Sequence, residues 1–104
     1  MPREVISGTV LDERVTLSVV DICQACGCRE EWVLELVDHG VLEPGGSRRD
    51  DWRFGVESIT RVITARRLHR DLGVNVEGIA LTLELLDEVN ALRTRIERLS
   101  PEED

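Results

Sequence analysis

Apolar residues recur at heptad spacing near the end of this 104-residue chain. Their positions follow one another at intervals of four, three, four and three: Leu85, Val89, Leu92, Ile96 and Leu99. Such a seam is typical of a helix that packs along a second helix. The five residues after it, Ser-Pro-Glu-Glu-Asp, offer no apolar cover. We therefore expect a helix over residues 76–99 that forms a homodimer, with packing of the seam on its own domain as the alternative.

A short helix and a turn are predicted further upstream. Ser18 is followed three residues later by Asp21, which matches a capping box, so a helix should run from about Val19 to Ala25. Gly27 then permits the positive φ that a tight turn requires. Residues 15–17 before this helix are rich in β-branched side chains and indicate a short strand.

A second helix should follow the turn and end at Gly40. Its inner face holds apolar residues at helical spacing: Val33, Leu36 and Val37. A polar loop comes next, and Trp52 and Phe54 alternate like the returning strand of a wing. Two short helices, a glycine turn and this loop predict a winged helix-turn-helix.

A third helix is predicted from Val56 to Leu72, closed by Gly73. Its inner face is expected to hold Ile59, Val62, Ile63 and Leu68. Asn75 is a plausible cap for the final helix, whose second stripe should pack on the third helix through Ile79, Leu83 and Leu86. The fold class is mainly α, divided into an arm at residues 1–14, a winged helix-turn-helix domain at 15–75, and a dimerisation helix with an acidic tail at 76–104.

Composition limits the function classes. All thirteen basic residues are arginine, against twenty-one acids, which gives a formal charge of −8. A protein that binds nucleic acid through phosphates should have the opposite balance. No apolar run approaches the ~20 residues that cross a bilayer, and no signal-peptide core is present, so we expect a soluble cytoplasmic protein with no membrane partner.

The only three cysteines lie within six residues, at Cys23, Cys26 and Cys28. An odd number is unsuited to a disulfide framework and agrees with a reducing compartment. A reactive thiol pair is favoured at a helix N-terminus, whereas Cys23 and Cys26 are predicted at a C-terminal end, where the helix dipole opposes the thiolate. We interpret the three as small buried residues, with a soft-metal site as the alternative, and expect neither metal nor cofactor.

The second predicted helix carries four carboxylates and no arginine. In the DNA major groove these carboxylates would face phosphates and be repelled, so direct DNA binding is disfavoured. A basic protein partner suits this helix better, because complementary charge steers association. An exposed tryptophan among carboxylates would serve as an apolar anchor. The expected partner surface is Glu30, Glu31, Trp32, Glu35 and Asp38, and a solvated acidic face is the alternative.

Arginines outside this helix could still form a phosphate-facing patch, at Arg48, Arg49, Arg53, Arg61, Arg66, Arg67 and Arg70. The alternative is a solvated face paired with neighbouring acids. Catalysis has little support, because His39 and His69 have no nucleophile nearby in sequence and no glycine-rich phosphate loop is present. We therefore expect no enzyme, and His39 is placed to favour a helix C-terminus.

The order of these elements resembles a MerR-type winged-helix domain and, more narrowly, the CbpM family of chaperone modulators, across roughly residues 15–99. The resemblance lies in the motifs Gly40-Val-Leu-Glu-Pro44, Trp52-x-Phe54, Arg67-Leu-His-Arg-Asp-Leu72 and Gly78-Ile-Ala-Leu-Thr-Leu-Glu-Leu-Leu-Asp87. In MerR activators the second helix usually carries Arg and Tyr residues that meet DNA. Trp32-Val-Leu-Glu35 departs from that pattern.

The resemblance implies a small cytoplasmic protein that binds the J-domain of a CbpA-type Hsp40 co-chaperone and inhibits its work with Hsp70. A J-domain presents a basic helix to Hsp70, so an acidic modulator that competes for that helix makes electrostatic sense. The resemblance does not say which residues touch the J-domain. A MerR-like DNA-binding transcription regulator remains the alternative function.

Overall fold

The computed structural model describes residues 15–99. The predicted arm at 1–14 and the acidic tail at 100–104 lie outside the described residues. Two strands and four α-helices follow in the order β1 (Thr16–Leu17), α1 (Val19–Cys26), α2 (Glu30–Asp38), β2 (Phe54–Gly55), α3 (Glu57–Leu72) and α4 (Val76–Leu99). The mainly helical, winged helix-turn-helix class predicted from the sequence is confirmed.

The start of α1 is held by the predicted capping box. The backbone N–H of Asp21 donates to the Ser18 hydroxyl at 3.1 Å, and the Ser18 N–H donates to the Asp21 carboxylate at 2.9 Å. The second bond lowers the pKa of Asp21, because it favours the charged carboxylate. Gly27 ends α1 with φ of +67°, as the sequence predicts.

The wing is closed by a two-stranded antiparallel sheet. Thr16 pairs with Gly55 and Leu17 with Phe54, and a single bridge joins Gly45 to Arg53. The returning strand is therefore Phe54–Gly55, not the Trp52–Phe54 segment predicted from the alternation of its aromatics. Trp52 follows the 3-10 turn η2 (Arg49–Asp51) and packs edge-on against the buried Phe54, at 6.3 Å between ring centroids.

The core gathers one side chain or more from each helix around Phe54. Its largest fully buried members are Ile22, Val33, Leu36, Leu42, Phe54, Val62 and Ile79. Two predicted core residues are instead 43% exposed, Ile63 on α3 and Leu86 on α4. The buried face of α3 runs through Ser58, Val62 and Ala65, which turns Ile63 outward. On α4, packing reaches Leu83 and stops there.

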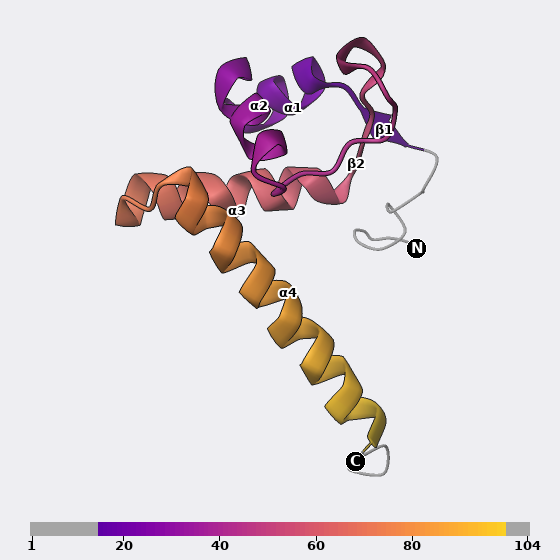
Figure 1. Ribbon diagram of the computed structural model, residues 1–104, viewed down its shortest axis with the longest axis vertical. Coiled ribbons are helices and arrows are strands. Elements are labelled where there is room, and N and C mark those ends of the chain that lie inside the picture. The colour runs from indigo at the N-terminus through magenta and orange to yellow at the C-terminus, as the bar shows by residue number, and fades with distance from the viewer. Residues whose placement is uncertain (1–14, 100–104) are drawn as a thin grey trace.

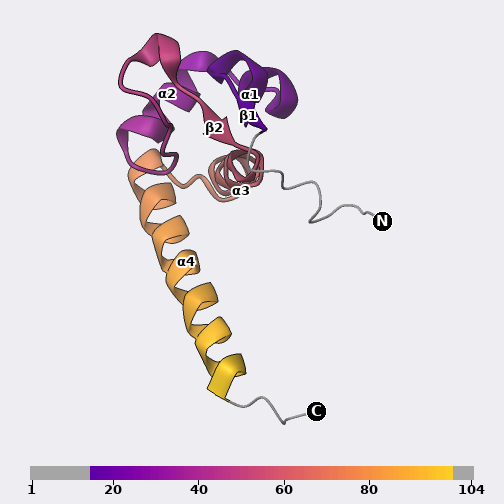
Figure 2. The same cartoon turned by 90° about the vertical axis from the view of Figure 1, so that its right-hand side faces the viewer.

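The structure divides into a head, which contains β1 to α3 and α4 as far as Leu83, and an extension, which is the rest of α4 (Figure 1). Helices α1 and α2 and the wing lie on one side of α3. In both views α4 starts beside the head and projects away from it (Figure 1 and Figure 2). Gly73, with φ of +68°, closes α3, and the Asn75 side chain accepts from the Gly78 N–H at 2.8 Å to begin α4. Beyond Leu83 each residue of α4 is exposed.

Candidate functional site

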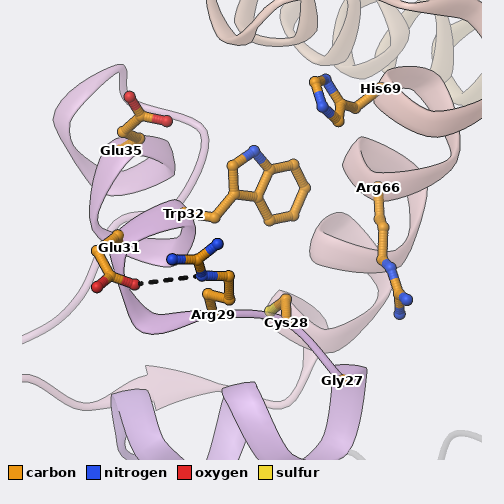
Figure 3. Close-up of a pocket in the computed structure, with 8 residues that line it drawn as sticks. All are labelled: Gly27, Cys28, Arg29, Glu31, Trp32, Glu35, Arg66 and His69. Carbon is orange, nitrogen blue, oxygen red and sulfur yellow. Dashed lines mark ion pairs between the residues drawn. The ribbon is translucent and has the colours of Figure 1, made fainter.

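A shallow groove of about 450 Å³ lies between the N-terminal half of α2 and the C-terminal half of α3 (Figure 3). We call it the Trp32 groove. Trp32 extends from α2 toward α3, with His69 opposite it and Cys28 at the turn below. Its lining residues are Gly27, Cys28, Arg29, Glu31, Trp32, Glu35, Arg66 and His69.

The predicted acidic face of α2 is present. Glu31, Glu35 and Asp38 lie three to four residues apart, so they share the side of the helix opposite the buried Val33 and Leu36. All three carboxylates belong to exposed residues. We call them the α2 ridge. Glu30 is also exposed, but it lies on the flank of the helix, away from the Trp32 groove.

Trp32 departs from the prediction. It was expected to be an exposed anchor, but it is half-buried and packs against the hydrophobic core. Its ring centroid lies 6.2 Å from that of His69, with the two planes tilted by 44°. The reason is its position on the flank of α2, one residue before the buried Val33, which turns the indole toward α3. Part of the ring remains accessible as the floor of the groove.

The Trp32 groove has mixed charge, whereas the charged residues of the partner surface predicted from the sequence are all acidic. Arg29 lies 3.9 Å from Glu31 on the groove rim. Arg66 donates a hydrogen bond to the Cys26 carbonyl at the end of α1. That bond satisfies a carbonyl left free at the helix terminus, where positive charge is also favoured by the helix dipole. Arg29, Glu31 and Glu35 therefore line the α2 side of the groove, and Arg66 lies on the α3 side.

The predicted phosphate-facing patch of arginines is broken by such internal bonds. Arg66 caps α1, and Arg61 donates to the Val41 carbonyl at 2.8 Å and to the Asp87 carboxylate. Arg49 lies over the Trp52 ring at 6.0 Å in the wing. At least three of the seven arginines are thus engaged within the head.

The three cysteines occupy packing positions around the turn between α1 and α2. The N–H groups of Gly27 and Cys28 both donate to the Cys23 carbonyl, at 2.8 and 3.2 Å. In a helix C-terminal cap of this kind, the side chains at the positions of Cys23 and Cys28 usually contact each other. Cys26 is buried. Burial raises the pKa of each thiol, and for Cys28 raises it to about 11, which disfavours thiolate chemistry.

Within residues 15–99, no three His, Cys, Asp or Glu side chains gather in a way that could hold a metal ion. His39 and His69 are instead bound to backbone: His39 Nδ1 lies 3.0 Å from the Glu35 carbonyl, and His69 Nδ1 lies 3.1 Å from the Val74 carbonyl. No helix in this part of the chain is both long enough and apolar enough to cross a membrane.

The heptad seam on α4 has no cover within the described chain. Its five residues are between 41% and 78% exposed: Leu85, Val89, Leu92, Ile96 and Leu99. Their exposure contradicts the alternative in which the seam folds back onto its own domain. The exposed Leu81, four residues before Leu85, extends this apolar face toward the head, and the exposed Leu86 lies on its flank.

Five residues of the Trp32 groove were absent from the partner surface predicted from the sequence, and two of them, Arg66 and His69, come from α3. They lie three residues apart on α3 and so share one face of that helix, which is a visible signal. Nothing local in the sequence shows that this face meets Trp32, more than thirty positions earlier.

Comparison with known proteins places this chain in a recognised group. Residues 17–101 match the family described as MerR HTH family regulatory protein. A chaperone modulatory protein CbpM from Coxiella burnetii is 33% identical over 99 residues, covering 95% of this chain and 93% of the relative. CbpM proteins from Pseudomonas entomophila and Pseudomonas putida are 39% and 40% identical over 80 residues, covering 77% of this chain and 79% of each relative.

Proposed function

This chain belongs to the CbpM family of chaperone modulatory proteins, within the MerR helix-turn-helix regulators, and from that premise we propose that it modulates a chaperone by binding a J-domain. The J-domain is that of a CbpA-type Hsp40 co-chaperone. The protein acts in the cytoplasm, without catalysis, and inhibits the J-domain by occupying the surface that Hsp70 would use.

The observation that carries this proposal is the α2 ridge beside the Trp32 groove. Glu31 and Glu35 belong to both, so a partner on the ridge also meets the indole. Charge steers a basic partner to the ridge, and a half-buried aromatic supplies contact area that excludes water. The surface therefore combines attraction with an apolar anchor.

The same ridge argues against the alternative function in DNA binding. The second helix of a helix-turn-helix enters the major groove through its exposed residues. In this chain those residues include Glu31, Glu35 and Asp38, whose carboxylates would be repelled by phosphates. The matching family model describes regulatory proteins, so the chain should also be tested for DNA binding by a mobility-shift assay.

Charge reversal on the ridge tests the proposal. The double variant Glu31→Arg with Glu35→Arg should weaken binding of the purified J-domain by about tenfold or more at low salt, as measured by calorimetry. The matched control reverses the same number of charges in the wing, at Asp50 and Asp51, and should alter affinity far less. Equal affinities for the wild type and the ridge variant would refute this placement, and site-specific DNA binding would favour the alternative.

Fluorescence gives a second measurement at the groove. The chain has only two tryptophans, Trp32 and Trp52. A Trp52→Phe variant leaves Trp32 as the sole indole, and J-domain binding should shift its emission because the partly accessible ring becomes covered. An emission spectrum that stays the same at saturating J-domain would place the partner away from the Trp32 groove.

We also propose that two copies of the chain pair through the α4 seam. An apolar face is exposed along the projecting half of α4, and its heptad spacing suits a second helix. A dimer would present two α2 ridges.

A further inference from the structure

A second groove, about 520 Å³ in volume, lies between the loop that follows α2, the first turns of α3 and the first half of α4. We call it the Ser58 groove. Its lining residues are His39, Gly40, Val41, Leu42, Glu43, Glu57, Ser58, Arg61, Ala80, Glu84 and Asp87. None of these residues lines the Trp32 groove, so the two grooves are separate concave surfaces.

Negative charge is concentrated in the Ser58 groove. Four carboxylates line it, and one of them, Asp87, is paired with Arg61 at 3.1 Å. The other three have no ion pair within residues 15–99: Glu43, Glu57 and Glu84. Unpaired carboxylates around a concave surface focus a negative potential that attracts a cation.

Ser58 supplies an independent sign of a ligand. It is 5% exposed and lines the groove, and among the described residues its hydroxyl has no hydrogen-bond partner. A buried hydroxyl without a partner costs about 1–3 kcal/mol, so most such groups in proteins are bonded. The hydroxyl of Ser58 can accept from a donor that enters the groove.

The chemistry favours an organic cation over a metal ion. No group of three or more potential metal ligands is close enough to share an ion in the part of the chain that the structure describes. An ammonium or guanidinium group carries several N–H donors on a long stem, so it can reach carboxylates on separate elements and the Ser58 hydroxyl together. Lysine and arginine side chains carry these groups.

The Ser58 groove lies within reach of a partner on the α2 ridge. His39 lines this groove, and Glu35, four residues earlier, lines the Trp32 groove. Residues at this spacing lie on one face of a helix, about one turn apart. His39 is the residue that ends α2, so a single protein lying along α2 would meet both grooves.

We propose that the Ser58 groove receives a lysine or arginine side chain of the protein partner that binds the α2 ridge. The inference rests on the proposed function, because it concerns the same basic partner. It adds a second contact point, in which Glu57 and Glu84 neutralise the incoming charge and Ser58 accepts one of its hydrogen bonds.

Two variants test the contact by calorimetry with the purified J-domain. Ser58→Ala leaves the charge unchanged and should weaken binding about fivefold or more, because a hydrogen bond from a charged donor is lost. It should also raise the melting temperature of the free protein, since a buried unpaired hydroxyl is removed. The double variant Glu57→Gln with Glu84→Gln should weaken binding about tenfold.

The matched control is Asp50→Asn with Asp51→Asn in the wing, which removes the same charge and should alter affinity less than about twofold. If the J-domain affinities of both groove variants equal that of the control, the inference is overturned. The proposed function would then still stand if reversal of Glu31 and Glu35 weakens binding. A wild-type protein that does not bind the J-domain would overturn both proposals.

Discussion

Nη1 of Arg61 on α3 lies 3.1 Å from Oδ1 and 3.2 Å from Oδ2 of Asp87 on α4, while Nε of the same arginine donates to the Val41 carbonyl at 2.8 Å. One guanidinium thus joins α3, α4 and the loop after α2. The Asp87 contact comes one turn beyond Leu83, the last buried residue of α4. Arg61 therefore ties the long helix to the head one turn beyond its last buried residue.

Removal of this side chain should loosen the joint between head and extension. Arg61→Ala should lower the free energy of unfolding by about 1–2 kcal/mol, because loss of the largely covered guanidinium deprives the Val41 carbonyl of its hydrogen-bond donor. Asp87→Asn should cost less, about 0–1 kcal/mol, because the carboxylate is mostly exposed. Urea denaturation measures both. The control is Arg70→Ala, which removes an exposed pair with Asp71, and a cost for Arg61→Ala no larger than this control would contradict the prediction.

The elements of the fold were predictable where their signals are local. Ser18 and Asp21 make the expected capping box, and Gly73 and Asn75 separate α3 from α4 as the sequence indicates. The errors on α3 and α4 concern which of two apolar stripes on the helix is covered. Ile63 and Leu86 have the spacing of core residues, but the crossing of one helix over another decides their exposure.

The pH dependence of stability should have a contribution from His39 at the end of α2. The hydrogen bond to the Glu35 carbonyl, with the negative charges of Glu77 and Glu35, raises the pKa of His39 above 6.5, and Nε2 lies 3.5 Å from Glu77. A raised pKa in the folded state means that folding favours the protonated ring. The stabilisation is therefore complete below 6.5 and is lost as pH rises through the higher, folded-state value.

A comparison of His39→Gln with the wild type isolates this contribution. Between about pH 5.5 and about pH 8.5, the difference in unfolding free energy should shrink as pH rises, because only the wild type loses a proton from this site. Glu77→Gln is the control that removes one carboxylate and keeps the His39 ring. The pKa of His39 in this variant, measured by NMR, should be lower than in the wild type. A difference between wild type and His39→Gln that stays constant with pH would contradict the assignment.

The cysteines should be slow to react in the folded protein. Burial raises the pKa of all three thiols, with Cys28 at about 11, so the reactive thiolate is scarce at neutral pH. Ellman's reagent should react at least about tenfold more slowly with the folded chain than with the chain in guanidinium. Replacement of Cys23 and Cys26 by alanine should leave J-domain affinity within about threefold of wild type, because neither residue lines the Trp32 groove. A fast-reacting thiol in the folded protein would restore the redox interpretation.

The acidic part of the candidate site was readable from the sequence because it needs only helical spacing. Glu31, Glu35 and Asp38 fall on one face of α2 whatever packs beneath it. The partial burial of Trp32 and the approach of His69 depend on how α3 crosses α2, which no local pattern encodes. The Ser58 groove is harder still, because it joins three elements that are distant along the chain.

Self-association through α4 can be tested at the centre of the seam. Leu92 is 52% exposed and lies between Val89 and Ile96 on the same apolar face. Leu92→Glu would place a charge opposite the second helix, so sedimentation equilibrium should show at least about a tenfold weaker dimer. The head should keep its stability, because no buried residue of α4 lies beyond Leu83 among the residues described.

The control for this variant is Arg98→Glu, two positions after Ile96 and on the side of α4 away from the heptad seam. It changes charge by a larger amount but leaves the apolar face intact, so the dimer should persist if burial of the seam holds it together. Equal weakening by Arg98→Glu and Leu92→Glu would instead indicate a general charge effect. A wild-type protein that sediments as a monomer at micromolar concentration would contradict pairing through the seam, and the exposed face of α4 would then have to be covered by another partner.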